Sequence, residues 1–269
     1  MNQPRKVIIL SAGQGRRLLP LTSSVPKCSL LVSGRSVLEW QLREITRCDI
    51  DEVVIVTGFA APVVDELLEQ MDLGQLRVRT LFNPFFAVSD NLGTCWIARE
   101  EMRSEFVLIN GDTLFEAAIL QRLLQSSPRA PITLAADAKP HYDEDDMLIV
   151  SEGGRLLRVG KRLGIPEVNG ESIGMLAFRS DGASAFRGRI EQLMRSTEGL
   201  ARWYLSAIDG LAGEGGVNVC SIKGLRWCEI DTRFDLAHAK VMVDVLPADE
   251  QQFNARVSGH AAALGAARE

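Results

Sequence analysis

Short apolar runs alternate with amphipathic segments along the first half of the chain. Continuous apolar runs predict strands buried on both faces of a parallel sheet, and helical spacing of apolar residues predicts helices between them. This alternation is typical of βαβ units with right-handed crossovers, and so of an α/β fold. The predicted strands are residues 6–12, 52–58, 76–82, 105–109 and 131–137, and the predicted helices are 36–47, 62–74, 91–103 and 116–125. Ser36 and Glu39 fit a capping box.

The pattern changes after residue 146. Short strands between 147 and 178 flank a Gly153-Gly154 turn, which indicates a strand-rich insert of about residues 138–180 over the sheet edge. Helices at 181–195 and 200–212, strands at 217–222 and 226–230, and a helix at 233–245 complete the pattern. We therefore expect one domain over residues 1–246 and a tail at 247–269 that forms a last helix or frays.

Composition narrows the class of protein. The 269 residues are 46% apolar and 24% charged, which excludes disordered and fibrous classes. The longest stretch without charged residues, 53–64, is too short to span a bilayer, so no membrane partner is expected. The five cysteines include no C-x-x-C pair and suit a reducing compartment, which predicts a cytoplasmic protein.

Charge is unevenly distributed along the chain. The net charge of −5 argues against a general nucleic-acid binder. Residues 1–47, however, hold eight Lys and Arg against two Glu, a local charge of 8 − 2 = +6. An acidic chain therefore begins with a basic segment.

The basic segment contains a glycine-rich loop that follows the first predicted strand. Gly13 and Gly15 allow backbone amides to approach a ligand closely, while Arg16 and Lys27 add positive charge. These features indicate a polyphosphate cradle. The loop matches neither G-x-x-x-x-G-K-[ST] nor G-x-G-x-x-G, which disfavours a P-loop ATPase and a Rossmann dehydrogenase.

This loop closely resembles the signature of the nucleotidylyltransferases, G-x-G-x-R-L-x-P-L-T followed by P-K. The resemblance implies that Arg17 and Lys27 contact a nucleoside triphosphate, with Gly15 and Arg16 in the same loop, and that Ala12 and Gly13 lie against the base. It also implies a Rossmann-like three-layer fold with a mixed, mainly parallel sheet of the nucleotide-diphospho-sugar transferase type. The matching positions are Gly13, Gly15, Arg17, Leu18, Pro20, Leu21, Thr22, Pro26 and Lys27.

Two carboxylates follow predicted strands at the ligand edge of the sheet. Asp112 comes after the apolar run 106–109, and Asp231 comes after 226–230. Such a residue can hold Mg²⁺ together with substrate phosphates, although an Asp in this position more often closes a turn or caps a helix. The resemblance implies that Asp112 and Asp231 are the two metal carboxylates.

Residues 83–94 follow the third strand and resemble the N-P-F-Y and N-N segment of the phosphocholine cytidylyltransferase branch. Asn83 and Thr94 are therefore candidates for nucleoside contacts, since an Asn side chain can recognise the edge of a base. As ordinary turn residues they would need no such function.

Acceptor-side candidates lie in the predicted insert. By resemblance, Lys161 would pair with the acceptor phosphate and Glu171 would lie nearby, whereas the E-K-P motif of sugar-phosphate enzymes is missing. Tyr142 and the acidic run 143–146 could face a cationic head group, but the default for such a run is a solvated loop. The default for Trp96, Trp203 and Trp227 is a place in the core, and the three His show no zinc-ligand spacing.

Together these features predict a Mg²⁺-dependent nucleotidylyltransferase that releases pyrophosphate. CTP is favoured, with phosphocholine or a related amino-alcohol phosphate or phosphonate as acceptor. The alternatives are a sugar- or polyol-phosphate nucleotidylyltransferase that uses UTP, dTTP or CTP, a metal-dependent glycosyltransferase, and a catalytically silent nucleotide-binding module. Oligomeric state is not readable from the pattern.

Overall fold

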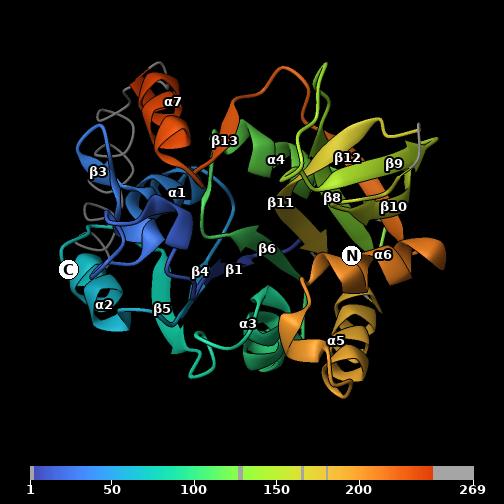
Figure 1. Cartoon of the computed structure of the whole chain (residues 1–269), viewed down its shortest axis with the longest axis horizontal. Helices are drawn as coiled ribbons and strands as arrows, with labels where there is room; N and C mark the ends of the chain where they lie inside the picture. The colour runs from blue at the N-terminus through green and yellow to red at the C-terminus, as the bar shows by residue number, and fades with distance from the viewer. Residues whose placement is uncertain (1–2, 127–129, 165–166, 180, 245–269) are drawn as a thin grey trace, which may run out of the picture.

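The computed structural model describes residues 3–126, 130–164, 167–179 and 181–244. The predicted tail at 247–269 lies outside these residues. A nine-stranded sheet runs through the middle of the molecule, and helices cover both of its faces (Figure 1). In spatial order its strands are β5 Arg77–Phe82, β4 Glu52–Thr57, β1 Lys6–Ser11, β6 Phe106–Asn110, β11 Gly170–Phe178, β8 Ile132–Asp137, β12 Val217–Ser221, β10 Arg155–Gly160 and β9 Leu148–Glu152.

The sheet is mixed, with parallel pairing on either side of a central antiparallel strand. β5, β4, β1 and β6 are parallel neighbours, as are β8 and β12, whereas β11 runs antiparallel to both β6 and β8. β1 lies between β4 and β6, and its residues Val7, Ile8 and Ile9 are fully buried. The carboxyl ends of β1 and β6 consequently meet at one edge, as the parallel pattern predicted.

Two apolar clusters form the core between the sheet and the helices on its two faces. One lies between the sheet and α3, α5 and α6, and the other lies between the sheet and α1 and α4 (Figure 1). The three-layer α/β architecture expected from the sequence is thus confirmed. The α-helices are α1 Val37–Thr46, α2 Ala61–Glu69, α3 Asn91–Ile97, α4 Ala117–Gln125, α5 Asp181–Met194, α6 Leu205–Gly213 and α7 Arg233–Asp244.

The start of α1 follows the predicted cap. Ser36 Oγ accepts a hydrogen bond of 3.0 Å from the Glu39 amide. Glu39 itself pairs with Arg35 and Arg43. The predicted helix 91–103 is shorter than expected, because the chain tightens into a 3₁₀ turn at Ala98–Met102.

The predicted insert is placed differently in the structure. Its hairpin, β9 and β10, is part of the main sheet, where β10 pairs with β12. β9 also pairs with the start of β11, so the hairpin turns back toward the middle of the sheet. β11 lies in the middle of the sheet, between β6 and β8, and all nine of its residues are buried. The reason is its apolar content, which requires cover on both faces. Gly174, at φ 71°, lies where the β11–β8 register shifts and leaves room for the Asn110 side chain.

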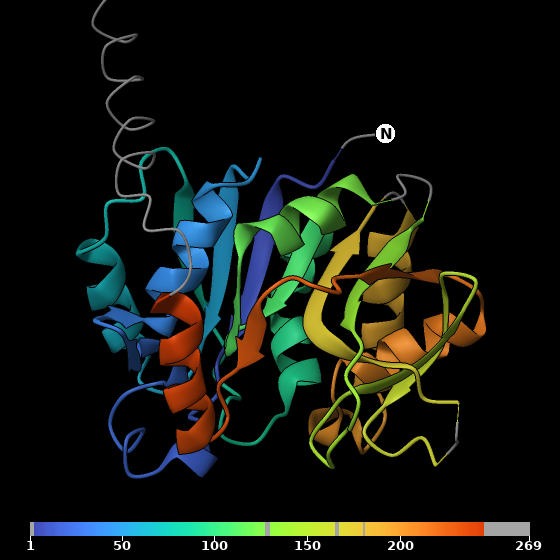
Figure 2. The ribbon, with the colours of Figure 1, turned by 90° about the horizontal axis from the view of Figure 1, so that it is seen from above.

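A third apolar cluster stands at the carboxyl edge of the sheet. It joins the first loop to α7 and to a small antiparallel pair, β7 Thr113–Phe115 and β13 Trp227–Glu229. The pairing of these two strands was not predicted. In Figure 2 the chain enters β1 near the N label, and the loop after β1 lies at the opposite edge, beside α7. Members of the cluster are Leu18, Leu30, Val32, Val37, Leu114, Cys228, Ile230, Ala239, Met242 and Val243.

Arg179 closes α4 from the end of β11. Its guanidinium is 2% exposed and donates to the carbonyl oxygens of Leu123 and Leu124 at 2.8 and 3.0 Å. We predict that Arg179→Met lowers the free energy of unfolding by about 2–3 kcal/mol, because buried acceptors lose a charged donor. Urea unfolding measures the change. Arg122→Met, an exposed change on the same helix, is the control, and equal stability of the two variants would contradict the prediction.

Candidate active site

Lys27, Asp112 and Asp231 meet at the carboxyl edge of the sheet. Lys27 begins the 3₁₀ turn η2 Lys27–Ser29, Asp112 lies between β6 and β7, and Asp231 follows β13. The β7–β13 pair brings the two aspartates together, and the Ile230 amide donates to the Asp112 carbonyl oxygen at 3.1 Å. The convergence expected from the motifs is present.

The Lys27 ammonium bridges the two carboxylates. Its Nζ is 2.7 Å from Asp112 Oδ2 and 2.5 Å from Asp231 Oδ1. Burial lowers the pKa of Lys27, but the two neighbouring carboxylates outweigh it, so that the pKa lies above its ordinary value. The ammonium is therefore charged.

The turn that carries Asp112 is held from two sides. A side chain at Gly111 would collide with Ser11 and with the Leu10 carbonyl, so glycine lets this turn lie directly against the end of β1. Gln41 of α1 donates to the carbonyl oxygens of Asn110 and Thr113 at 2.8 and 2.9 Å. Asp112 is thus fixed by its backbone, while its carboxylate points to Lys27.

The glycine-rich loop folds over the stem of Lys27. Gly15 has φ 76°, and a Cβ there would stand 3.0 Å from the Lys27 side chain. Thr22, which is fully buried, donates from Oγ1 to the Gly15 carbonyl at 2.9 Å. Gly13 and Arg16 are exposed at this edge, while Ala12 is buried. Gly13 and Arg16 are therefore accessible at this edge, while a role of the loop as a phosphate cradle stays a prediction.

Arg17 connects the loop to the same carboxylates. Its guanidinium lies 2.8 Å from Asp231 Oδ2 and 2.5 Å from Asp145 Oδ2. Asp145 also accepts from Lys161 at 3.1 Å, and the Lys161 ammonium stands 4.8 Å from the Trp203 ring centre. The predicted triphosphate and acceptor sides are therefore linked through one carboxylate.

These contacts correct two expectations from the sequence. The acidic run 143–146 is not simply a solvated loop, because Asp145 and Asp146 pair with site cations. Trp203 is not a core residue, since it is 39% exposed. The sequence could not predict either contact, because only folding brings Lys161 to Trp203 and Arg17 to Asp145.

The remaining acceptor-side candidates form a second ion cluster. Lys139 Nζ lies 2.9 Å from Glu171 Oε2 and 2.8 Å from Asp146 Oδ2, and it stands 6.0 Å from the Tyr142 ring centre. Burial raises the pKa of Glu171 to about 7, even though Lys139 donates a hydrogen bond to it. Sequence reasoning missed Lys139, which has no motif around it.

Glu229 was missed as well. Burial raises the pKa of its carboxyl to about 8, and the carboxylates of Asp112 and Asp231 add to the shift. Its place in the E-I-D segment, two residues before Asp231, was the signal that could have identified it.

Asn83 and Thr94 lie together, but inside the protein. Asn83 is fully buried and donates from Nδ2 to Thr94 Oγ1 at 3.2 Å. Its Oδ1 accepts from the Phe85 amide at 2.9 Å. These bonds hold the turn after β5, so a nucleoside contact of either side chain stays a prediction.

The two aspartates have the chemistry of a divalent-cation site. Asp112 Oδ1 is buried and has no hydrogen-bond partner, while its other oxygen faces Lys27. Over the described parts of the chain, no three His, Cys, Asp or Glu side chains cluster as a metal site. Two carboxylates suit Mg²⁺, which takes its other oxygen ligands from water and substrate phosphates.

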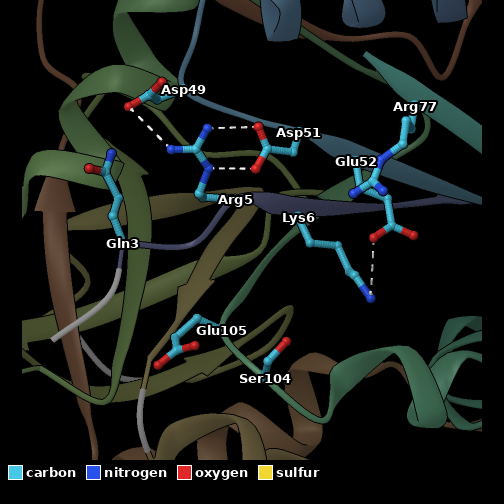
Figure 3. Close-up of a pocket in the computed structure, with 9 residues that line it drawn as sticks. All are labelled: Gln3, Arg5, Lys6, Asp49, Asp51, Glu52, Arg77, Ser104 and Glu105. Atoms are coloured by element: carbon cyan, nitrogen blue, oxygen red, sulfur yellow. Dashed lines mark hydrogen bonds and ion pairs between the residues drawn. The ribbon is translucent and has the colours of Figure 1, made fainter. Parts of the chain in front are cut away.

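A cavity of about 400 Å³ lies at the opposite edge of the sheet (Figure 3). Its lining charges already pair with one another, Arg5 with Asp51 and Lys6 with Glu52. Arg5 precedes β1 and Lys6 begins it, whereas the candidate active site follows the end of β1. This cavity is therefore separate from the candidate active site.

Residues 7–209 match the MobA-like NTP transferase domain, and the chain belongs to this family. The family resemblance of the first loop is thereby confirmed. Within the described residues, no helix is long and apolar enough to cross a membrane.

Curated relatives include cytidylyltransferases. A CMP-5'-(3-aminopropyl)phosphonate synthase of Streptomyces rubellomurinus is 27% identical over 93% of this chain and 40% of its own length. A choline-phosphate cytidylyltransferase of Streptococcus pneumoniae is 29% identical over 56% of this chain and 67% of its own length. A CTP:phosphoglutamine cytidylyltransferase of Campylobacter jejuni is 22% identical over 85% and 96%. The chain thus spans less than half the length of the phosphonate synthase.

Solved structures with this fold include proteins that are described as a cytidylyltransferase and a UDP-glucose pyrophosphorylase. The CTP:phosphocholine cytidylyltransferase of Streptococcus pneumoniae has a TM-score of 0.72 at 20% identity, covering 88% of this chain and 98% of that chain. A UDP-glucose pyrophosphorylase complexed with UDP-glucose has a TM-score of 0.76 at 12% identity, covering 90% and 98%. The likeness confirms the predicted fold class.

Glu171 predicts a specific pH dependence of stability. Folding raises the pKa of the Glu171 carboxyl from 4.5 to about 7. Such a carboxyl stabilises the folded protein fully at a pH below its unfolded pKa, and this stabilisation is lost as the pH rises through its folded pKa. Wild type should therefore lose more stability than Glu171→Gln between about pH 5 and about pH 8. Urea unfolding at each pH, with the exposed Glu66→Gln as control, measures this; parallel profiles would contradict it.

Proposed function

We propose that the chain is a Mg²⁺-dependent cytidylyltransferase that joins CTP to a small phosphorylated amino alcohol, or a related phosphonate, and releases pyrophosphate. The observation that carries the proposal is the convergence of Lys27, Asp112 and Asp231 beside the glycine-rich loop. CTP is favoured because the relatives named above are CMP- or cytidylyl-transferring proteins. The buried thiols of Cys28, Cys95, Cys220 and Cys228 support a reducing, cytoplasmic setting.

The acceptor side supports a zwitterionic acceptor. Lys139 and Lys161 provide positive charge for a phosphate, while Asp145, Asp146 and Glu171 provide negative charge for an ammonium. A phosphorylated amino alcohol carries both charges on one small molecule. A sugar phosphate carries no cationic group, so it would offer these carboxylates no charge to bind.

The reaction we propose is an in-line displacement at the α-phosphorus. An acceptor phosphate oxygen forms the new P–O bond, and the bond to the β-phosphate oxygen breaks with its electron pair leaving on pyrophosphate. No protein base is required, because a phosphate dianion is already a nucleophile at neutral pH. Lys27 and Arg17 bind and orient the anionic phosphates, and the loop amides of Gly13 and Gly15 hold them close.

Asp112 and Asp231 are the residues that would hold Mg²⁺. When bound there, the ion supplies charge neutralisation for the phosphate oxygens. The Asp112 oxygen without a hydrogen-bond partner fits this role.

A pyrophosphate-release assay tests the function. CTP, UTP, dTTP, ATP and GTP are each combined with phosphocholine, phosphoethanolamine, 2-aminoethylphosphonate and glucose 1-phosphate. We expect release with CTP and an amino-alcohol phosphate or phosphonate. Release only with a sugar phosphate would favour the alternative function, a sugar-phosphate nucleotidylyltransferase. Nucleotide binding without any turnover would indicate a catalytically silent nucleotide-binding module.

Asp112→Asn and Asp231→Asn should each lower turnover on the order of a hundredfold or more at saturating Mg²⁺, because a charged ligand of the ion is lost. Steady-state pyrophosphate release measures the loss, and a melting curve checks that each variant folds. Asp65→Asn, an exposed change on α2, serves as the matched control. Unchanged turnover in either site variant would disprove its assignment.

A further inference from the structure

Lys27 occupies the space between the two predicted metal carboxylates. Its ammonium has three N–H groups, and Asp112 and Asp231 accept two of them at 2.7 and 2.5 Å. The Lys27 side chain is 12% exposed, compared with 48% for Arg17. The lysine is thus held inside the cluster and is not extended toward solvent.

The cluster is neutral without any ligand. Asp112 and Asp231 carry two negative charges, and Lys27 and Arg17, the latter 2.8 Å from Asp231, carry two positive charges. Arg17 also pairs with Asp145, and Lys161 offsets the charge of that carboxylate. An incoming divalent cation would find no net negative charge. It would also stand close to a buried ammonium, and repulsion between like charges at such distances is strong where water is excluded.

A polyphosphate changes this balance. Its negative charges offer new partners to Lys27 and Arg17, and these partners free the carboxylate oxygens for a cation. The loop that would bind the phosphates already touches the Lys27 stem, since a Cβ on Gly15 would stand 3.0 Å from Lys27 Cβ and Cδ. Phosphates bound by this loop would therefore lie beside the Lys27 side chain.

We propose that Lys27 closes the Asp112–Asp231 pair to a free divalent cation, so that the cation is taken up only together with the triphosphate. The inference rests on the proposed function in one respect, the assignment of these aspartates as cation ligands. Lys27 would then have two roles, as an internal countercharge in the free protein and as a phosphate ligand in the loaded one.

Binding of Mn²⁺ alone to the nucleotide-free protein tests the proposal, with electron paramagnetic resonance as readout. Wild type should bind Mn²⁺ weakly, and Lys27→Met should bind it on the order of tenfold more tightly or better, since repulsion is removed. The double variant Lys27→Met with Asp112→Asn should lose this gain in Mn²⁺ affinity, which would show that the ion binds at Asp112. Lys6→Met is the matched control, because Lys6 also lies near two carboxylates, Glu52 and Glu101, at the far end of β1.

Equal Mn²⁺ affinity of wild type and Lys27→Met would overturn the proposal. If Lys27→Met does not fold, Lys27→Gln takes its place and the same outcomes apply.

A second measurement needs no change at Lys27. In wild type, Mn²⁺ binding that Asp112→Asn abolishes should appear only when CTP is present. Such binding in the nucleotide-free wild type would refute the closure. Because the first readout uses the metal alone, it stays decisive even if the pyrophosphate assay finds another nucleotide or acceptor.

Discussion

The pairing of β7 with β13 is the constraint on which the site depends. Lys27 is separated from Asp112 by 85 positions and from Asp231 by 204, so no local structure could hold the three together. The short antiparallel ladder places Asp231 beside the turn that follows β6. α7 and the first loop pack on this ladder through the third apolar cluster, and a small apolar core therefore supports the charged groups above it.

The charged groups themselves are arranged as mutual partners. Lys27 and Arg17 neutralise Asp231 from two sides, and Asp145 joins Arg17 to Lys161. Unpaired charges at a partly buried site would be costly, and these ion pairs satisfy them within the protein. Ligands of high charge can enter by exchange, since each new contact replaces an internal one. The proposed joint binding of an anion and a cation rests on this exchange.

The proposed acceptor side belongs to the main sheet. Glu171 lies in β11 opposite Asp137 of β8, and Lys161 directly follows β10. A strand inserted between β6 and β8 ties these side chains to the same rigid layer that carries Asp112. The two halves of the site are consequently fixed relative to each other by backbone hydrogen bonds, which suits a reaction that depends on aligning two phosphates.

The sequence by itself determined the α/β class, most of the strands and helices, and the motif residues that converge. Apolar runs and the glycine-rich loop are local patterns, and a local pattern can be recognised without knowing how the rest of the chain folds. Only the tertiary structure decided that β11 lies inside the sheet, that Asp145 pairs with Arg17 and Lys139 with Glu171, and that Asn83 is buried. Pairing between distant strands and ion pairs between distant loops depend on which surfaces folding brings together, and a run of Asp or a lone Lys looks the same in a solvated loop as it does beside a substrate.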